Sequence, residues 1–448
     1  MTKTRHVNYL LIGGGIASLR AIEGIRRVDR RGRILLVGDE AWPPYDRPPL
    51  SKGIVTGAVS AKEILAERRR FYWKNRVRVR RDNSVTALDL SAEKPVATLA
   101  DGTRITFDRA LYATGGRARR LEFAEETEAG VRVLRTLDDA IGVRAEVVRS
   151  GGAAAIVGAG FIGAELAASL VQAGVAVDLV EARDEVWPET APAALRRYIR
   201  TWLGNRGVQI HTGSMVRRLD SSARSGPGAV PASGGSAPHS VLLSTGARLE
   251  ADLVCVAAGI DPNTGIAQHA GIAVDDGIVC DSTLRSSDPR VFAAGDVANI
   301  PDPLSGRRRR VEHYNIAEYS GLLAGENMAR DRTASVRSTA ILSEYDYLST
   351  FWSDIGSLHV ESAGDDMDAT WSIERGSLEP SGNPGPWLAF GMSGNRVVAY
   401  YAMNAARADI SAAQLLIRNK VDVSTISDAL RDTTVPLSAT VGELLKNR

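Results

Sequence analysis

The N-terminal residues alternate between apolar runs and a glycine-rich segment in an order that predicts a βαβ unit. An apolar run over residues 7–12 predicts a buried strand, and Gly13-Gly14-Gly15 predicts a tight turn. Residues 16–27 are expected to form a helix, and the apolar run over 33–37 a second strand. Because strand, helix and strand in this order build a parallel sheet, the N-terminal segment is predicted to begin an α/β fold.

The same pattern returns in the middle of the chain. An apolar strand over residues 153–157 leads to Gly158-Ala159-Gly160, a helix is predicted as far as residue 173, and a strand over 175–180 follows. The chain is therefore expected to contain two Rossmann-type units, which repeat the fold rather than the sequence.

Each glycine turn has the spacing of a dinucleotide cradle. The first glycine permits a tight turn, and the second lets the backbone approach a pyrophosphate at the positive end of the following helix. The third position must be small so that helix and strand can pack. The residues at these positions are Gly13, Gly15 and Ser18 in the first unit, and Gly158, Gly160 and Gly163 in the second. Either motif alone is weakly specific, because glycine-rich turns between strand and helix are common.

A carboxylate follows the second strand of each unit. Asp39 lies where it can hold ribose hydroxyls, and Glu181 directly follows the strand that ends at residue 180. A carboxylate there accepts a hydrogen bond from the adenosine 2′-hydroxyl and repels a 2′-phosphate, so Glu181 favours NADH over NADPH. The nearby Arg183 would weaken that preference. The alternative for Glu181 is a solvated charge at a strand end.

Two further apolar strands end in residues that suit a cofactor. The strand near residue 110 ends in the small residues Ala113, Thr114 and Gly115, where the backbone would pass close to a ligand. Another strand ends in Gly295-Asp296. Because an aspartate at the carboxyl end of a parallel strand points into the crevice where ligands bind, Asp296 is a candidate for holding the ribityl hydroxyls of FAD.

Length and composition set the expected domains. A chain of 448 residues exceeds one ordinary core, so two or three domains are expected. Residues 221–240, rich in glycine, serine and proline, predict a flexible insertion, and the strand and helix patterns after residue 330 predict an α+β third domain. The expected division is an FAD-binding domain over 1–120 and 246–330, an NADH-binding domain over 121–245, and a C-terminal α+β domain over 331–448.

Charge and cysteine content exclude several function classes. Cys255 and Cys280 are the only cysteines and cannot form a C-x-x-C pair, so a redox-active dithiol in sequence is excluded. The sequence has no metal-ligand spacing, and no metal is expected. A formal net charge of +2 argues against nucleic acid or a membrane surface as an electrostatic partner. A strand begins almost at once and no apolar run reaches about 18 residues, so we expect no signal peptide or membrane helix and predict the cytoplasm.

These motifs occur together in a known family. The chain resembles the flavoproteins with two dinucleotide-binding domains related to glutathione reductase. Within that group it most resembles the ferredoxin reductases that serve oxygenases and cytochromes P450, and apoptosis-inducing factor. The diagnostic stretch is Pro44-Tyr45-Asp46-Arg47-Pro48-Pro49-Leu50-Ser51-Lys52, which stands where disulfide reductases carry their cysteine pair. Supporting stretches lie at residues 134–140, 158–166, 257–263, 310–314 and 351–354.

The resemblance implies an α/β fold with two glutathione reductase-like Rossmann-type domains and a C-terminal α+β domain, residues 331–448, that is the interface domain of the family. It also implies FAD and NADH as cofactors. The expected FAD contacts, from the motifs and the resemblance together, are Gly13, Gly15, Ile16, Ala17, Asp39, Arg47, Lys52, Val85, Ala113, Thr114, Gly115, Arg135, Gly295, Asp296, His313 and Trp352. The expected NADH contacts are Gly158, Gly160, Phe161, Ile162, Gly163, Glu165, Glu181, Arg183 and Gly259.

Four residues are expected to act beside the flavin: Lys52, Glu165, Tyr314 and His313. The family counterpart of Lys52 lies there, and a desolvated pair of Lys52 with Glu165 would serve positioning and electrostatic control rather than stability. Tyr314 stands where the ferredoxin reductases usually carry tryptophan over the nicotinamide, and it can still stack with less area. His313 would touch the flavin or be an ordinary hydrogen-bonded histidine.

Two aromatic residues and three basic runs each keep two interpretations. Phe161 would gate the nicotinamide site or pack on the sheet, and Trp352 would close the flavin edge or pack in the third domain. The runs Arg68–Arg70, Arg76–Arg81 and Arg307–Arg310 would steer an acidic ferredoxin or be solvated surface charges. The alternating charges of Arg76–Arg81 also suit a protected edge strand.

The expected activity is an NADH-dependent FAD reductase that passes electrons to a small acidic carrier such as a ferredoxin, as a monomer or homodimer. One alternative is a flavoenzyme that acts on a small organic substrate in a biosynthetic pathway. Another is an NADH redox sensor like apoptosis-inducing factor.

Overall fold

The computed structural model of the protein describes residues 5–121, 131–221, 239–334, 341–379 and 385–446, which form two compact units. Unit 1 consists of Met1–Pro48, Ala61–Arg117 and Ile260–Ser349. Unit 2 consists of Pro49–Ser60, Ala118–Gly259 and Thr350–Arg448. Nearly all of the insertion expected near 221–240 lies outside the described residues.

Unit 1 is built on a seven-stranded sheet in the order β3-β2-β1-β6-β5-β4, with β18 paired to β6. β4 and β5 run antiparallel to their neighbours, and the other strands run parallel. β2 is buried along its whole length, as a parallel strand covered on both faces should be. The strands of this sheet are β1 (Arg5–Ile12), β2 (Ile34–Val37), β3 (Val77–Arg80), β4 (Val85–Asp89), β5 (Val96–Leu99), β6 (Arg104–Tyr112) and β18 (Val291–Ala293).

The register of this sheet brings the predicted cofactor residues to one edge. Ile12 at the end of β1 pairs with Val37 of β2 and with Tyr112 of β6. The glycine turn, Asp39 and Ala113 therefore all leave the sheet at the carboxyl ends of neighbouring strands. The other elements of unit 1 are α3 (Arg69–Lys74), β7 (Gly116–Ala118), β16 (Ile260–Pro262), α7 (Gly265–His269), β17 (Ile278–Val279), the 3-10 turn Gly295–Val297, β19 (Ala298–Pro301) and β20 (Arg308–Arg310).

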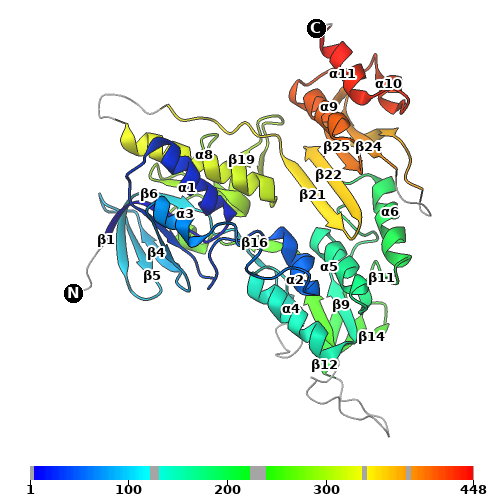
Figure 1. The fold of residues 1–448 in the computed structure, drawn as a ribbon, viewed down its shortest axis with the longest axis horizontal. Coiled ribbons are helices and arrows are strands. Elements are labelled where there is room, and N and C mark those ends of the chain that lie inside the picture. The colour runs from blue at the N-terminus through cyan, green and yellow to red at the C-terminus, as the bar shows by residue number, and fades with distance from the viewer. Residues whose placement is uncertain (1–4, 122–130, 222–238, 335–340, 380–384, 447–448) are drawn as a thin grey trace. The chain divides into compact units, whose positions relative to one another are not determined.

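Two helices of unit 1, α1 (Ile16–Val28) and α8 (Tyr314–Thr333), pack along each other, as Figure 1 shows. Three glycines permit this close approach. A Cβ at Gly24 would collide with the Leu322 carbonyl oxygen of α8, and a Cβ at Gly321 or Gly325 would collide with the backbone of α1. The predicted helix over 16–27 is thus held against a second helix that begins directly after His313.

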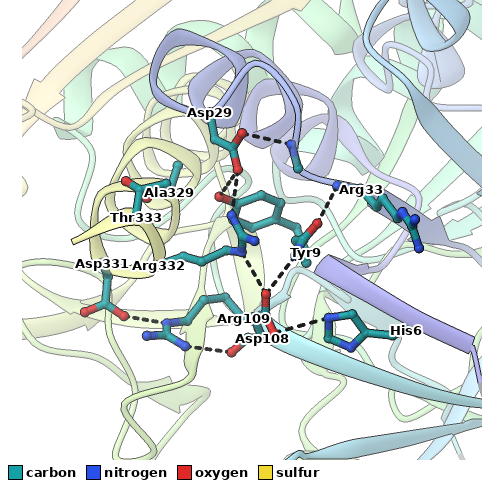
Figure 2. A network of polar contacts seen from close by, with 12 residues as sticks. His6, Tyr9, Asp29, Arg33, Asp108, Arg109, Ala329, Asp331, Arg332 and Thr333 are labelled. Atoms are coloured by element: carbon teal, nitrogen blue, oxygen red, sulfur yellow. Dashed lines mark hydrogen bonds and ion pairs between the residues drawn. The ribbon is translucent and has the colours of Figure 1, made fainter. Parts of the chain in front are cut away.

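A polar network ties these two helices to the sheet (Figure 2). Arg332, in the last turn of α8, donates to Asp29 at 2.9 Å and to Asp108 at 2.7 Å, and the Tyr9 hydroxyl donates to Asp29 at 2.9 Å. Burial opposes the charge on both carboxylates. Hydrogen bonds outweigh it, chiefly from the Arg31 and Gly32 amides to Asp29 and from Asn8 and Arg332 to Asp108, so the pKa of each aspartate lies below its ordinary value.

This network predicts a loss of stability in acid. A carboxylate whose pKa is depressed by folding adds stability above its unfolded pKa of about 4, and that stability is lost as the pH falls through the folded value. We expect Arg332→Met to lower the free energy of unfolding by about 2 kcal/mol at pH 7, and by less below pH 4. Urea denaturation at both pH values checks this. Arg330→Met is the matched control, because Arg330 on the same helix makes a looser pair with Glu326 at 3.6 Å. An equal loss for Arg332→Met at both pH values would contradict the prediction.

Unit 2 contains the second parallel sheet, in the order β11-β10-β9-β15-β8. Its strands are β8 (Val131–Val133), β9 (Ala153–Val157), β10 (Ala176–Val180), β11 (Gln209–His211) and β15 (Leu253–Val256). A three-stranded antiparallel sheet consists of β12 (Val216–Ser221), β13 (His239–Leu243) and β14 (Arg248–Ala251). The helices of this part are α2 (Gly53–Thr56), α4 (Leu137–Ser150), α5 (Phe161–Gln172) and α6 (Ala193–Gly204), and the 3-10 turn Pro48–Ser51 precedes α2.

The expected division into three domains, with a boundary after residue 245, stays a prediction. In the structure β14 pairs with β13 and β15 pairs with β9, and residues 248–256 lie within unit 2. Such pairing between distant strands is not reported by any local sequence pattern.

The C-terminal part of unit 2 is an α+β arrangement, which confirms the fold class. An antiparallel sheet in the order β21-β22-β25-β24-β23 is followed by three helices. These elements are β21 (Thr350–Ile355), β22 (Leu358–Gly364), β23 (Thr370–Arg375), β24 (Trp387–Ser393), β25 (Arg396–Met403), α9 (Arg407–Arg418), α10 (Ser427–Arg431) and α11 (Leu437–Lys446).

Neither cysteine takes part in a disulfide. Cys255 lies in β15 and Cys280 in unit 1, and both are buried. Burial raises the pKa of each thiol to about 12, so both are protonated and unreactive near neutral pH. Within the described part of the chain, no helix has the length and apolar character needed to cross a membrane, and no three His, Cys, Asp or Glu side chains gather as metal ligands would.

Candidate functional site

The first glycine turn leaves an open helix end in unit 1. Gly13 has a φ of +113°, and a Cβ there would collide with the carbonyl oxygen of Ala113. Gly15 is the N-cap of α1 without any side-chain cap, and a Cβ added to it would meet nothing within 4 Å. The first amides of α1, from Ile16 and Ala17 on, therefore border free space at the positive end of the helix. This geometry fits a pyrophosphate.

Gly295 and Asp296 lie next to this turn, as the sequence predicts for a shared site. A Cβ on Gly295 would approach the Ala17 side chain to 3.2 Å, and the Gly295 amide donates to the Ser320 hydroxyl at 3.0 Å. Asp296 follows in the first turn of a short 3-10 helix. The strand end of β18 and the start of α1 thus meet where the motif analysis expects a cofactor.

The acidic partner of the first turn consists of two neighbouring carboxylates. Asp39 is exposed after β2, and Glu40 accepts from Arg47 at 2.8 Å and from the Tyr45 hydroxyl at 2.6 Å. Burial opposes the charge of Arg47, but Tyr45, Glu40 and Asp296 outweigh it, and the pKa of the guanidinium lies above its ordinary value. The sequence analysis missed Glu40, although an acidic residue directly after Asp39 could have indicated it.

The segment Ala113–Gly115, which follows β6, is hydrogen-bonded to Asn263, which follows β16. The Thr114 hydroxyl donates to the carbonyl oxygen of Asn263 at 2.9 Å, and the Asn263 side-chain amide donates to the Thr114 carbonyl oxygen at 3.0 Å. Gly115 has a φ of +59°. Val85, another expected FAD contact, is 3% exposed and lies in the core of unit 1. The side chains of Thr114 and Val85 therefore serve the fold, and the contact of this segment with a cofactor would be made by the backbone.

Tyr314 and His313 begin α8. The Tyr314 hydroxyl donates to Asp46 at 2.6 Å, and burial together with this bond raises the pKa of the phenol above its ordinary value. Tyr314 is therefore a neutral, oriented ring, half buried in unit 1. His313 is the N-cap residue of α8 and makes no side-chain cap. The structure leaves both interpretations of His313 open.

The second glycine turn repeats the open helix end in unit 2. Gly158 has a φ of +105°, and a Cβ there would lie 2.5 Å from the Ala257 carbonyl oxygen. A Cβ on Gly163 would collide with the Gly158 carbonyl oxygen. Gly160 caps α5 without a side-chain cap, and a Cβ there would meet nothing within 4 Å. Ile162, in the first turn, is 43% exposed, so this end of the helix also fits a pyrophosphate.

Glu181 is bound to the turn that it is expected to serve. It is 6% exposed and accepts from the Ala159 amide at 2.7 Å and from the Arg183 amide and Nε at 3.1 Å each. A carboxylate held by the glycine turn itself is not a freely solvated strand-end charge. Arg183 is partly exposed beside it. Gly259, with a φ of +89°, lies between β15 and β16.

Phe161 belongs to an aromatic cluster. Its ring lies edge-on to Trp187 at 4.7 Å between centroids and tilted against Phe351 of β21 at 4.1 Å. Trp187 is fully buried, whereas Phe161 is half buried. The ring packs against Trp187 and β21, and the gating role predicted for it stays a prediction.

Glu165 is the centre of the densest polar cluster of the expected site. Its carboxylate is 5% exposed and accepts from Lys52 Nζ at 2.9 Å, from the Ser353 hydroxyl at 2.6 Å, from the Asp354 amide at 3.1 Å and from the Ser51 hydroxyl at 2.5 Å. The predicted pair of Lys52 and Glu165 is thus formed. The serines were missed because a hydroxyl carries no charge pattern, although each lies inside a stretch that resembles the family.

Three expected FAD contacts, Lys52, Arg135 and Trp352, lie in unit 2. The Arg135 amide donates to Asp139 at 3.0 Å, next to the capping box that starts α4. Trp352 lies half buried on β21. The contact of these three residues with FAD stays a prediction.

The comparisons with known proteins agree with this geometry. The family described as pyridine nucleotide-disulphide oxidoreductase matches residues 7–321, and the family described as reductase C-terminal matches residues 350–441. The chain is 32% identical over 416 residues to the probable ferredoxin reductase CtmF of Castellaniella defragrans (strain DSM 12143 / CCUG 39792 / 65Phen), covering 92% of this chain and 94% of that protein. It is 31% identical over 412 residues to the ferredoxin–NAD(+) reductase component of the anthranilate 1,2-dioxygenase system of Burkholderia cepacia, covering 91% and 93%. A solved structure of a covalent putidaredoxin reductase–putidaredoxin complex matches with a TM-score of 0.84 and 27% identity over 98% of each chain.

Proposed function

The chain belongs to the pyridine nucleotide-disulphide oxidoreductase family, and from that premise we propose that it passes electrons from NADH through FAD to a ferredoxin-like carrier of an oxygenase or cytochrome P450 system. One observation supports this most directly. Two open glycine turns, one in each parallel sheet, fit two dinucleotides, while both cysteines are free and buried. Because no described disulfide is present to take electrons from a flavin, an external acceptor must take them. The relatives that match over more than nine tenths of the chain are named as ferredoxin reductases.

The residues of the chain would bind and orient the two cofactors. The first amides of α1, with Asp39 and Asp296, would hold FAD, and those of α5, with Glu181, would hold NADH. When bound, FAD accepts a hydride and releases electrons singly, which is the chemistry that the protein itself lacks. Glu165 fixes the Lys52 ammonium, a cation that would stabilise a negatively charged reduced flavin beside it.

Anaerobic half-reactions test this function. The purified protein should bind FAD, lose its flavin absorbance when NADH is added, and regain it when an oxidised ferredoxin is supplied. Slow reoxidation with a persistent long-wavelength band would instead indicate a redox sensor. Reoxidation by a small organic compound but not by any ferredoxin would indicate a biosynthetic flavoenzyme. A correctly folded protein that takes up no FAD would overturn the proposal.

The position of Glu181 predicts a preference for NADH. We expect kcat/KM for NADH to exceed that for NADPH by about tenfold or more, because a buried carboxylate bonds a 2′-hydroxyl and repels a 2′-phosphate. Glu181→Gln keeps an acceptor for the Ala159 amide but loses the charge, so it should narrow the ratio. Glu185→Gln, which removes a nearby charge paired with Arg200 at 3.5 Å, is the matched control. Equal kcat/KM values in the wild type would refute the assignment.

The structure separates the basic runs by what their charges contact. In the run Arg307–Arg310, Arg308 donates to the Cys280 and Asn299 carbonyl oxygens, and Arg310 pairs with Asp276 and Glu312. Around α3 the situation differs. We give the name α3 patch to six exposed residues: Arg68, Arg69, Arg70, Trp73, Lys74 and Arg76. None of the cations among them pairs with a carboxylate of the described residues. Trp73, an aromatic residue of this patch, is 81% exposed. Unneutralised charge of this kind suits the steering of an acidic carrier.

Steering predicts a dependence on salt. Replacing Arg68, Arg69 and Arg70 together with glutamine should lower kcat/KM for the oxidised ferredoxin about fivefold at low ionic strength, and much less at 0.5 M salt. The matched control replaces Arg30, Arg31 and Arg33, three exposed arginines of the same unit. Steady-state ferredoxin reduction across a salt series measures both. A loss that is independent of salt, or equal in the control, would reject the α3 patch as the steering surface.

The compartment and the assembly are proposals of the same kind. Two buried free thiols suit a reducing compartment, and we propose the cytoplasm. The protein is proposed to act as a monomer or homodimer.

A further inference from the structure

A row of charged side chains leads from the buried Glu165 to the surface of unit 2. Lys52 Nζ lies 2.9 Å from Glu165 Oε1 and 3.9 Å from Asp354 Oδ2. The other oxygen of Asp354 contacts His359 Nδ1 at 2.6 Å. His359 Nε2 contacts Glu361 Oε1 at 2.9 Å. Exposure of the side chains rises from 6% at Glu165 through 25% at Lys52 to 45% at His359, and is 20% at Glu361.

The β21–β22 hairpin fixes this row. Asp354 of β21 is directly opposite His359 of β22, and Trp352 is opposite Glu361. Because side chains alternate between the faces of a strand, these four residues share one face of the hairpin. Phe351 and Ser353 lie on the other face, where Ser353 binds Glu165. The hairpin therefore presents a hydroxyl to Glu165 and a carboxylate to Lys52.

His359 has the surroundings of an imidazolium. Each ring nitrogen contacts a carboxylate oxygen, and both nitrogens are donors only when the ring is protonated. Burial opposes this charge, but the bonds and charges of Asp354 and Glu361 outweigh it, so the pKa of His359 lies above its ordinary value of 6.5. The charged groups in contact with this arrangement are Lys52, Asp354 and Glu361, with Glu165 behind Lys52 and Arg407 of α9 at 4.0 Å from Glu361.

Asp354 has two competing cationic partners, the His359 imidazolium and the Lys52 ammonium. While His359 is protonated, Asp354 is held by the imidazolium at 2.6 Å, and Lys52 keeps its nearer partner, Glu165. When His359 becomes neutral, Lys52 at 3.9 Å is the remaining cation in contact with Asp354 among the described residues. The attraction of Asp354 for the ammonium then competes with that of Glu165.

We propose that His359 is a positioning residue, which in its protonated form holds Asp354 and thereby keeps the Lys52 ammonium on Glu165, in the orientation needed for reduction of the flavin by NADH. The inference rests on the proposed function only in that Lys52 acts beside the flavin. It adds a residue and a proton that set the position of Lys52. A group whose folded pKa is raised is fully protonated below its ordinary pKa and loses the proton as the pH rises through the folded value, so the orientation is lost on the alkaline side.

The first test is the titration of His359 itself. Long-range ¹H–¹⁵N spectra of the holoprotein with labelled histidine, assigned with His359→Gln among the six histidines, give the ionisation of this ring without any turnover. The wild-type value should lie above 6.5, and Asp354→Asn should bring it closer to 6.5. A wild-type value at or below 6.5 would overturn the proposal, whatever acceptor the protein uses.

The second test is the limiting rate of flavin reduction in anaerobic stopped flow, with saturating NADH, from pH 6 to pH 9. The wild-type rate should fall about tenfold as His359 loses its proton, while the Kd for NADH changes little, because a displaced catalytic group costs rate rather than binding. His359→Gln should show the low rate at every pH. His359→Arg, which is charged throughout this range, should keep the higher rate to pH 9. Asp354→Asn should remove the pH dependence.

The variants separate positioning from mere support of the hairpin. If His359 only supported the hairpin, His359→Gln and His359→Arg would reduce the flavin equally slowly, and the rate of each variant would depend on pH as the wild-type rate does. That result would overturn the proposal. Failure of any ferredoxin to reoxidise the flavin would count against the proposed function alone, since both tests end before electrons leave the protein.

Discussion

Glu165→Ala is expected to slow the reduction of bound FAD by NADH about a hundredfold. The carboxylate holds the Lys52 ammonium at 2.9 Å, and with it two hydroxyls and the Asp354 amide. Without Glu165 the nearest remaining anion to Lys52 is Asp354, at 3.9 Å, so the cation would leave its position. Stopped-flow absorbance of the flavin, with NADH as reductant under anaerobic conditions, measures the rate.

The same substitution should also destabilise unit 2. It leaves the Ser51 and Ser353 hydroxyls and a partly buried ammonium without their acceptor, which costs about 3 kcal/mol when one partner of a buried pair is removed. Glu165→Gln, which keeps the shape and one acceptor oxygen, should recover most of the stability but little of the rate. Thermal unfolding checks this difference in stability. The melting temperature should fall more for Glu165→Ala than for Glu165→Gln.

The matched control is Glu146→Ala. Glu146 is 5% exposed, lies on α4 of the same unit and pairs with Arg149 and Arg132. Its loss should lower the melting temperature and leave the rate of flavin reduction near the wild-type value. If Glu165→Ala reduced the flavin as fast as Glu146→Ala does, the central role given to Glu165 would be wrong.

Gly160→Ala is expected to weaken NADH binding by roughly 2 kcal/mol, about thirtyfold in affinity, without loss of stability. A Cβ at this position meets no protein atom within 4 Å, so the fold tolerates it. The same Cβ projects into the free space at the start of α5, where the pyrophosphate would approach the backbone. Gly15→Ala should act in the same way on unit 1, where the lost ligand is FAD.

Binding and stability are measured separately for these variants. Titration with NADH, the flavin content after dialysis and the melting temperature give the three quantities. Gly204→Ala is the neutral control, because Gly204 ends α6, is exposed and has no neighbour that a Cβ would meet, so its effect should lie within about 0.5 kcal/mol. Gly158→Ala is the opposite control. Its φ of +105° and the nearby Ala257 carbonyl oxygen should make it lose stability. Unaltered NADH binding by Gly160→Ala would remove this turn from the nucleotide site.

The basic run at Arg307–Arg310 shows where sequence reasoning reaches its limit. Four consecutive arginines predict a positively charged, exposed surface. In the structure the Arg310 guanidinium is 10% exposed and pairs with Asp276 and Glu312. The run Arg68–Arg70 also consists of arginines, and none of the three pairs with a carboxylate among the described residues. Charge patterns report which residues are cationic, but they do not report which carboxylates neutralise them, whether close in the chain, as Glu312 is, or distant, as Asp276 is.

What the sequence by itself determined about this protein is local. Glycines at positions 13 and 158 take positive φ values and border a strand backbone, and both strand–turn–helix units form where the apolar pattern predicts them. Only the tertiary structure decided the rest: that Ser51 and Ser353 join Lys52 on Glu165, that Tyr314 bonds Asp46, and that β15 (Leu253–Val256) belongs to the second parallel sheet. The physical reason is that backbone conformation depends on neighbours in the chain, whereas a buried carboxylate takes its donors from whichever segments the packing brings to it.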